Sequence, residues 1–319
     1  MSTLLNAFVK TLRHEAEDVV SIELLPAPGV VFPAFDAGSH IDLHLPNGLV
    51  RNYSLLNSTD DAGRYVIGVL QDRASRGGSR CVHQQLRVGM TIPIAAPRNN
   101  FHLHEDAGHS VLVAGGIGIT PILCMVQRLK ALGRSHELLY FARSRKSAAF
   151  VDRIEALGID VTWHFDDEQG GPPDLKALLA ARPAGANSHY YACGPAVLLD
   201  AFERHCEALG YAHAHIERFA ALAVDASPNA RTSYTAELRK SGRTFVITPE
   251  KSLLACLLEG GIDVEHSCQE GVCGTCETGV VSGVPDHRDS VLSSSEKASN
   301  KVMMVCVSGC KSERLVLDL

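Results

Sequence analysis

Four cysteines near the C-terminal end of the sequence set the strongest limit on how this chain can fold. Cys268, Cys273 and Cys276 have the spacing C-x4-C-x2-C within the segment HSCQEGVCGTCETG, and Cys306 follows after 29 further residues. Thiols at such a spacing can form disulfides, or they can hold zinc or an iron–sulfur cluster. The N-terminal segment becomes charged almost at once and lacks a secretory h-region, so we expect a cytoplasmic protein, in which persistent disulfides are rare. The thiols therefore indicate a metal centre.

An iron–sulfur cluster is the better interpretation of this spacing. Three cysteines from one tight loop and a distant fourth are typical of a plant-type [2Fe–2S] ferredoxin domain. Zinc is the alternative, because Cys273 and Cys276 form a C-x2-C knuckle, but zinc ribbons usually supply a second close pair, and here the fourth cysteine is single. Cys310 could replace Cys306 as the fourth ligand, although it lies beyond Gly309 and outside the apolar strand. Four other cysteines stand in apolar or helical contexts and are expected to be core thiols: Cys81, Cys124, Cys206 and Cys256.

Charge and hydropathy argue against two other classes of protein. The formal net charge is −6, whereas a general nucleic-acid-binding protein would usually be basic. The sequence has no apolar run near the roughly 20 residues that cross a bilayer. A chain of 319 residues, 45% hydrophobic and 21% charged, is long enough for two or three globular domains. We therefore expect a multidomain protein that binds neither nucleic acid nor membrane.

Segments with different predicted patterns of strands and helices indicate three domains. Residues 1–103 contain short β-like runs separated by turns, which predict a small antiparallel β-barrel. Residues 104–225 alternate strands with helices, which predicts a parallel, doubly wound α/β sheet that binds ligands at the carboxyl ends of its strands. Residues 226–232 are small, polar and broken by proline, as in a linker. Residues 233–319 predict an α+β domain of the plant-type ferredoxin class that carries the cysteine loop.

Two glycine turns of the second segment predict a dinucleotide site. In VAGGIGITP (residues 113–121) a buried strand runs into a helix, so that a pyrophosphate could approach the free N–H groups at the helix start. YACGP (residues 191–195) repeats the order of strand, turn and helix. The first turn lacks the full G-x-G-x-x-G fingerprint, and the same glycines could serve packing alone. Two such turns in one doubly wound segment favour a dinucleotide crevice.

The first segment offers residues for a planar, phosphorylated ligand. The motif RNYS places Arg51, Tyr53 and Ser54 at the end of a strand, where Tyr53 could stack on a ring and Arg51 could bind a phosphate with two hydrogen bonds. The Gly-Gly-Ser of residues 77–79 precedes an expected helix and could form a second anion-binding nest. The alternative is a barrel tyrosine beside a solvent-exposed arginine.

The motifs RNYS, GGIGITP, CGP and the cysteine loop, in that order, resemble the phthalate dioxygenase reductase family, close to the vanillate O-demethylase and phenoxybenzoate dioxygenase reductase components. The likeness covers nearly the whole chain and implies an FMN-binding barrel, an NAD-binding domain and a ferredoxin domain. It implies that Phe219, in the segment IERF, lies beside the flavin. The residues that the likeness implies for FMN and the nicotinamide coenzyme are Arg51, Asn52, Tyr53, Ser54, Val69, Gly77, Gly78, Ser79, Gly115, Gly116, Thr120, Pro121, Arg143, Ser144, Cys193, Gly194, Pro195 and Phe219.

One departure from the family pattern concerns the choice of coenzyme. After the strand LLYF the chain reads Ala-Arg-Ser-Arg-Lys (residues 142–146), where an acidic residue would favour the unphosphorylated ribose of NADH. Arg145 and Lys146 could bind the 2′-phosphate of NADPH, or they could form a surface charge pair. The resemblance implies NADH, and NADPH stays open.

Together the predicted sites form an electron-transfer chain. NADH gives up two electrons as a hydride and an iron–sulfur cluster accepts one at a time, whereas a flavin can exchange electrons in both ways. The resemblance implies a reductase that passes electrons from NADH through FMN and the cluster to a separate Rieske-type oxygenase acting on an aromatic compound. No residue has a certain catalytic role, and we expect a monomer. The alternatives are an NADPH-dependent reductase for another acceptor and a redox-sensing protein.

Acidic residues surround the cysteine loop. Asp263, Glu265, Glu270 and Glu277 carry negative charge, and no Lys or Arg lies between residues 263 and 277. Such a patch could steer the basic docking surface of an electron acceptor, which would make electron transfer sensitive to salt. A solvated loop face is the alternative.

Overall fold

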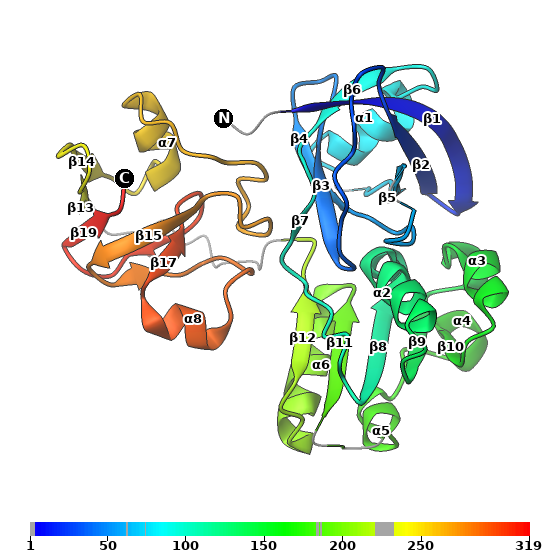
Figure 1. Ribbon diagram of the computed structural model, residues 1–319. Helices are drawn as coiled ribbons and strands as arrows, with labels where there is room; N and C mark the ends of the chain where they lie inside the picture. Colours follow the sequence, from blue (N-terminus) through cyan, green and yellow to red (C-terminus); the bar gives the residue numbers. More distant parts are fainter. Residues whose placement is uncertain (1–3, 62, 74, 183–184, 186, 221–232) are drawn as a thin grey trace. The chain divides into compact units, whose positions relative to one another are not determined.

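The chain divides into two compact units, one ending at Glu217 and the other beginning at Arg218 (Figure 1). The computed structural model describes residues 4–61, 63–73, 75–182, 185, 187–220 and 233–319. The linker expected at residues 226–232 lies outside the described residues. The domain boundaries expected from the sequence stay predictions.

The chain begins with a seven-stranded antiparallel sheet, which agrees with the fold predicted for the first segment. Its strands are β1 (Leu5–Ala16), β2 (Val19–Pro26), β3 (Ser39–His44), β4 (Val50–Ser54), β5 (Tyr65–Leu70), β6 (Thr91–Ile94) and β7 (Arg98–Asn99). They follow the order β4-β3-β6-β1-β2-β5, with β7 paired to β3. A bridge between Leu55 and Ile67 joins the two ends of this order. The helix α1 (Gly78–Gln85) follows β5.

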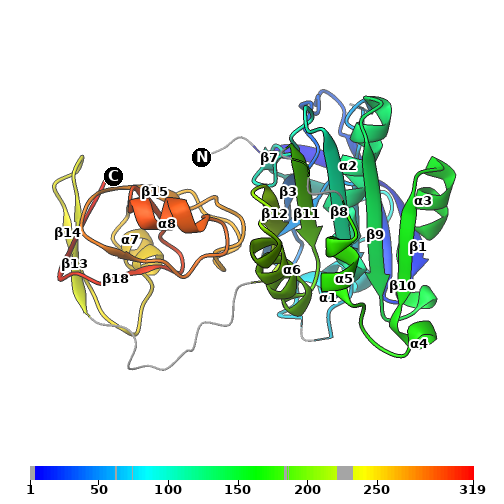
Figure 2. The same cartoon turned by 90° about the horizontal axis from the view of Figure 1, so that it is seen from below.

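A five-stranded parallel sheet follows in the same unit, as predicted. Figure 2 shows its strands side by side in the order β10-β9-β8-β11-β12. Their bounds are β8 (His109–Gly115), β9 (His136–Ala142), β10 (Val161–Phe165), β11 (Ser188–Cys193) and β12 (Ala214–Glu217). The helices are α2 (Ile119–Ala131), α3 (Val151–Leu157), α4 (Asp166–Gln169), α5 (Leu175–Ala180) and α6 (Ala196–Leu209), with short 3-10 turns η1 (Gly116–Gly118) and η2 (Arg145–Ser147). The order reverses between β8 and β11, and ligands bind at such a switch point in open α/β sheets.

Helix α2 connects the two sheets. It buries apolar side chains on several sides, including Ile119, Ile122, Met125 and Val126, because one hydrophobic core extends from the antiparallel sheet across α2 to the parallel sheet. A second core fills the opposite face of the parallel sheet under α5 and α6. The carboxyl edge of the parallel sheet is therefore held firmly against the antiparallel strands.

The C-terminal unit is an α+β fold, as predicted. Its main sheet has the order β14-β13-β19-β15-β17, from β13 (Tyr234–Leu238), β14 (Thr244–Ile247), β15 (Glu277–Ser282), β17 (Val302–Met304) and β19 (Arg314–Leu317). A small second sheet pairs β16 (Pro285–Asp286) with β18 (Gly309–Cys310). The helix α7 (Leu253–Glu259) packs its leucines into the core of this unit, and α8 (Ser294–Ser299) precedes β17. Within the described residues, no helix has both the length and the hydropathy that crossing a bilayer requires.

Candidate functional site

The four predicted metal ligands lie together in the C-terminal unit. Cys268, Cys273 and Cys276 belong to the loop between α7 and β15, Cys306 belongs to the turn after β17, and all four side chains are buried. The thiols form two pairs. A hydrogen bond from Cys273 lowers the pKa of Cys268 to about 7, and one from Cys306 lowers the pKa of Cys276, in each case against the effect of burial. Two thiol pairs from two chain segments fit the four-thiolate donor set of a [2Fe–2S] cluster.

The backbone of the loop closes tightly around these thiols. Gly271 has a φ of 72°, and a Cβ there would stand 2.6 Å from Val307 Cγ2 and 3.1 Å from Asp289 Cα. The backbone N–H of Glu270 donates to Cys268 Sγ (3.3 Å), as a donor to a ligating sulfur would. The tightly packed Gly271 and the N–H of Glu270 that points at a sulfur indicate a loop whose backbone is shaped around the thiols.

The other cysteines lie apart from this group. Cys310 Sγ is 3.2 Å from Ser312 Oγ and 3.9 Å from the carbonyl oxygen of Arg314, and so it turns toward its own strand connection. Cys306 is thus the better placed of the two candidates for the fourth ligand, and this assignment stays a prediction. All ten cysteines are free thiols. Of those expected in the core, Cys81, Cys124 and Cys206 are buried and Cys256 is half-buried.

Residues of the predicted flavin phosphate site lie together at β4 and the start of α1. Arg51 runs along Gly78, since a Cβ on Gly78 would stand 2.7 Å from Arg51 Cγ and Nε. Gly77 has a φ of 105°, which a side chain would disfavour, and its carbonyl oxygen accepts a hydrogen bond from Asn47 Nδ2 (3.2 Å). Ser79 Oγ accepts from the N–H of Asp72 (3.2 Å). A guanidinium and a helix start at one place can bind a phosphate group.

The remaining residues predicted for the flavin have different surroundings. Tyr53 is half-buried, and burial raises the pKa of its hydroxyl. Asn52 donates to the carboxylate of Asp42. The Val69 side chain is buried, and its carbonyl oxygen contacts His83 Nε2 (3.0 Å). Thr120 is also buried: its hydroxyl donates to the carbonyl oxygen of Ile117 (3.1 Å), and its methyl group packs against β5. Val69 and Thr120 thus pack inside the protein.

The two glycine turns of the parallel sheet contact each other. A Cβ on Gly118 would stand 2.2 Å from the carbonyl oxygen of Cys193, and one on Gly194 would stand 3.0 Å from Gly115 Cα. A Cβ on Gly115 would meet Pro195 Cδ at 2.8 Å. Three glycines of the two turns therefore allow the turns to pack closely, and the coenzyme contacts predicted for Gly115 and Gly194 stay predictions.

Gly116 has the environment that a ligand needs. It has a φ of 53°, and nothing lies within 4 Å of a Cβ built on it. Pro121, five residues later, is buried in the first turns of α2. Of the glycines predicted to approach a pyrophosphate, Gly116 is the one that faces open space.

Sequence reasoning missed Glu217. It is the last residue of β12, where it lies opposite Cys193 of β11, and Ser54 Oγ of β4 donates to Glu217 Oε2 (3.3 Å). Removal from water raises the pKa of Glu217 to about 8, although the hydrogen bond from Ser54 opposes this effect. Burial, and secondarily the Glu217 carboxyl, also raise the pKa of the Cys193 thiol. The only signal for it in the sequence is the acid in the segment IERF, and nothing local marks that acid as buried.

This contact brings the two predicted nucleotide sites together. Ser54 comes from the motif predicted for the flavin, and Cys193 comes from the motif predicted for the nicotinamide. The end of β4 therefore meets the carboxyl edge of the parallel sheet. A flavin and a nicotinamide held by these motifs would be neighbours.

Three further predicted residues lie outside this contact. Arg143 is exposed, and its carbonyl oxygen accepts from the N–H of Asp167 (3.1 Å). Ser144 caps the short turn η2, because its hydroxyl accepts from the N–H of Ser147 (3.2 Å). Phe219 follows β12, beyond the division between the two units, and is 41% exposed.

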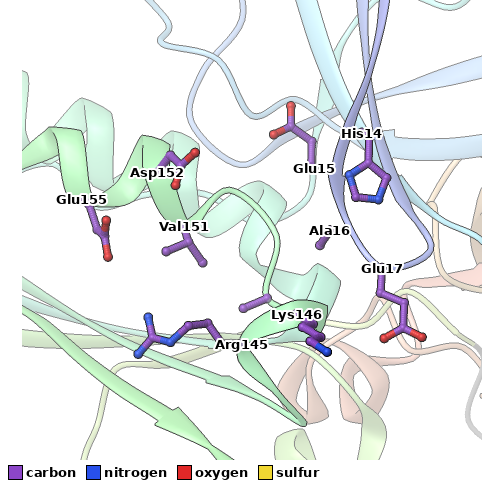
Figure 3. A pocket seen from close by; sticks show the side chains of 10 residues that line it. His14, Glu15, Ala16, Glu17, Arg145, Lys146, Val151, Asp152 and Glu155 are labelled. Atoms are coloured by element: carbon purple, nitrogen blue, oxygen red, sulfur yellow. The ribbon is translucent and has the colours of Figure 1, made fainter.

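A cavity of about 680 Å³ lies beside Arg145 and Lys146, between the end of β1 and the helix α3 (Figure 3). Its wall also carries the carboxylates of Glu15, Glu17, Asp152 and Glu155. The Arg145 guanidinium is 4.6 Å from the ring centre of Phe165 and 3.6 Å from a carboxylate oxygen of Glu168. The four carboxylates on the wall, together with Glu168 beside Arg145, outnumber Arg145 and Lys146. Repulsion between like charges therefore makes this cavity unfavourable for a 2′-phosphate.

The acidic residues near the cysteine loop are accessible. Asp263, Glu265 and Glu277 are exposed, and Glu270 is half-buried. Among the described residues, no ion pair involves Asp263, Glu265 or Glu277. Their negative charge is available to a partner.

Comparison with known proteins gives similarity over nearly the whole chain. The family described as 2Fe-2S iron-sulfur cluster binding domain matches residues 236–311. Phenoxybenzoate dioxygenase subunit beta of Ectopseudomonas oleovorans is 47% identical, over 98% of this chain and 96% of that protein. Tetrachlorobenzoquinone reductase of Sphingobium chlorophenolicum is 46% identical, over 98% of this chain and 97% of that protein. A solved structure of phthalate dioxygenase reductase has a TM-score of 0.73 and 36% identity, and the match covers 99% of this chain and 98% of that one.

Proposed function

The chain belongs to the phthalate dioxygenase reductase family, and on this premise we propose that it is the reductase component of a Rieske-type aromatic oxygenase or O-demethylase system. It passes electrons from NADH through FMN and a [2Fe–2S] cluster to the terminal oxygenase. One observation carries the proposal: a single chain holds a buried group of four free thiols, and it also joins the motif RNYS to the carboxyl edge of a parallel sheet through Ser54 and Glu217.

The residues of the N-terminal unit have distinct tasks in this function. The bound flavin exchanges electrons both in pairs and singly, which links a hydride donor to a one-electron acceptor. Arg51 and the first N–H groups of α1 bind its phosphate. Gly116 leaves room for the coenzyme to approach the backbone at the start of η1. Glu217 holds its proton at neutral pH, because its pKa is about 8, so it can donate a hydrogen bond to the coenzyme at the sheet edge.

In the C-terminal unit the four thiolates Cys268, Cys273, Cys276 and Cys306 hold the cluster. Gly271 allows the loop to close, and the N–H of Glu270 directs a hydrogen bond to a ligating sulfur. Hydrogen bonds to cluster sulfurs are one of the means by which a protein sets the reduction potential. The acidic residues Asp263, Glu265 and Glu277 attract a basic surface of the acceptor.

We favour NADH over NADPH because Arg145 already lies beside Glu168 and four carboxylates line the adjoining cavity. We expect a higher kcat/KM for NADH than for NADPH in steady-state assays. The variant Arg145→Ala should change the kcat/KM for NADPH by less than about threefold, whereas a 2′-phosphate ligand would cost considerably more. A large selective loss with NADPH would show that Arg145 binds the phosphate.

Location and oligomeric state form part of the proposal. The ten free cysteines support a reducing compartment such as the cytoplasm, since persistent disulfides are rare there. We propose a monomer that meets its oxygenase transiently. Sedimentation analysis across a range of protein concentrations checks the oligomeric state.

The proposal is tested by anaerobic titration with NADH, followed by optical and electron paramagnetic resonance spectra. We expect the flavin to bleach and a reduced-cluster signal to develop. The variant Cys273→Ser should lose that signal and keep the hydride transfer to the flavin. A flavin that stays oxidised in this variant contradicts the linear order NADH, FMN, cluster. Rapid turnover with artificial electron acceptors separates a reductase from a redox sensor.

A second candidate function has a specific basis in the relative that is named tetrachlorobenzoquinone reductase. A quinone can accept electrons from a reduced flavin directly, without a protein partner. The two functions differ in their need for the cluster. If quinones are the acceptors, Cys273→Ser should keep NADH-dependent quinone reduction near the wild-type rate, while it should abolish electron delivery to a Rieske oxygenase.

A further inference from the structure

Three histidines converge in the N-terminal unit at a place that the proposed electron path does not use. His189 is the second residue of β11, His215 lies in β12, and His104 lies in the connection between β7 and β8. One ring nitrogen of each lies within 4.8 Å of the other two. Cys193 lies four residues beyond His189, at the other end of β11, so the group is separate from the predicted nicotinamide edge.

The spacing of the ring nitrogens is close to that of metal ligands. His189 Nδ1 and His215 Nε2 share a hydrogen bond of 3.0 Å, and a metal ion would take the place of the shared proton. Two nitrogens bound to one tetrahedral zinc ion at 2.0–2.1 Å are about 3.3 Å apart. A ring nitrogen of His104 lies within 4.8 Å of both, and an inward rotation of this exposed side chain would complete such a site. Three ligands are therefore nearly in place.

Neighbouring aromatic residues hold the rings in position. The Tyr191 ring stacks on His215 at 4.8 Å, and its hydroxyl accepts from the backbone N–H of His104 (2.9 Å). The His213 ring stacks on His189 at 4.4 Å. The hydrogen bond from His104 fixes the connection between β7 and β8 against β11, which brings the third imidazole to the other two. Such support limits the rearrangement that a metal ion would require.

We propose that His104, His189 and His215 form a binding site for a divalent transition-metal ion, with Zn²⁺ as the best-suited ion. Imidazole nitrogens suit zinc, copper and nickel, whereas magnesium and calcium prefer oxygen ligands. Three protein nitrogens leave a fourth position for water. A metal ion there ties the connection that precedes β8 to the two strands β11 and β12, so its role is to stabilise this part of the sheet.

Equilibrium dialysis against Zn²⁺ tests the site in the tag-free, full-length protein with its iron–sulfur cluster intact, as judged by iron and sulfide content. An intact cluster keeps the four loop cysteines from binding zinc. We expect one Zn²⁺ per chain and no binding of Mg²⁺. The variant His104→Ala should weaken Zn²⁺ binding at least tenfold, because changes even to residues behind metal ligands cost about 10- to 100-fold. The exposed His102 is the matched control, and His102→Ala should bind Zn²⁺ like the wild type.

Unfolding provides a second measurement. Trp163, the single tryptophan, lies in β10 of the same sheet, so its fluorescence reports the unfolding of this unit. Zn²⁺ should raise the urea midpoint of the wild type and of His102→Ala but not that of His104→Ala. Equal binding or an equal midpoint shift in wild type and His104→Ala would overturn the site, and so would the absence of saturable binding. NADH-dependent reduction of ferricyanide should be the same in all three proteins, which separates this inference from the proposed function.

Discussion

Replacing Glu217 with glutamine should make the protein more stable, and increasingly so as the pH rises. The glutamine keeps the size of the side chain and an oxygen that can accept from Ser54, but it cannot ionise. The wild-type carboxyl has lost much of its hydration at the end of β12, which raises its pKa from 4.5 to about 8. The variant therefore removes an ionisation that the folded protein resists.

The sign and size of the effect follow from proton linkage. Above pH 4.5 the unfolded chain releases the proton of Glu217, whereas the folded protein holds it up to about pH 8. Ionisation of Glu217 thus favours unfolding. Its contribution to the free energy of unfolding therefore falls as the pH rises from 4.5 to about 8 and then levels off. At about 1.4 kcal/mol per pH unit, the difference between the folded and unfolded pKa values of Glu217 corresponds to about 5 kcal/mol above pH 8 and about 3 kcal/mol at pH 7. Water still reaches part of this side chain, so these values are upper limits.

Urea denaturation followed by the fluorescence of Trp163 at pH 5, 7 and 9 measures this effect. We expect the two proteins to differ by about 1 kcal/mol at pH 5, by at most about 3 kcal/mol at pH 7 and by at most about 5 kcal/mol at pH 9, with the variant more stable. The exposed Glu207 supplies the control, because Glu207→Gln should change stability equally at all three values of pH. A stability difference between wild type and Glu217→Gln that does not change with pH would refute a raised pKa at Glu217.

Two further predictions test the packing of the turns and the acidic surface. Gly118→Ala should lower the free energy of unfolding by about 3 kcal/mol or more, because its Cβ would stand 2.2 Å from the carbonyl oxygen of Cys193. Gly116→Ala, which has open space and only backbone strain, should cost about 1 kcal/mol in the same urea titration, and equal costs would contradict the contact between the turns. Glu265→Gln should slow the reduction of cytochrome c, a basic acceptor, by about twofold at low ionic strength and have no effect near 1 M salt, whereas Glu207→Gln should have no effect at either. A loss that persists at high salt would show that Glu265 does not act through long-range charge.

Local sequence patterns were sufficient for the fold class and the cluster domain. Three of the four predicted ligands occupy nine consecutive residues, so their spacing alone predicted a [2Fe–2S] domain, and the family match over residues 236–311 confirms that domain. The alternation of strands and helices after residue 104 predicted the parallel sheet, because each βα unit carries its own hydrophobic period. The motif order was specific enough to identify the family.

The same patterns could not show what each motif residue contacts. Gly115 and Gly194 were predicted to approach a coenzyme, which stays a prediction, and the structure adds that they pack against each other. Val69 and Thr120 were predicted to bind the flavin, which stays a prediction, and the burial of both side chains could not be read from the motifs. A glycine required by a neighbouring turn and one required by a ligand look alike in a sequence, because both contacts come from outside the local segment.

Two groups of residues come together only in the tertiary structure: the pair behind the stability test and the three histidines of the proposed metal site. Ser54 meets Glu217 across 163 residues, and His104 meets His189 and His215 from a connection far back in the chain. No local period links such positions. They meet because the reversal of strand order at β8 and β11 places β12 at the edge of the parallel sheet, and because one core holds that sheet against the antiparallel strands. Burial at this junction then sets the pKa of Glu217, a property that a linear sequence does not carry.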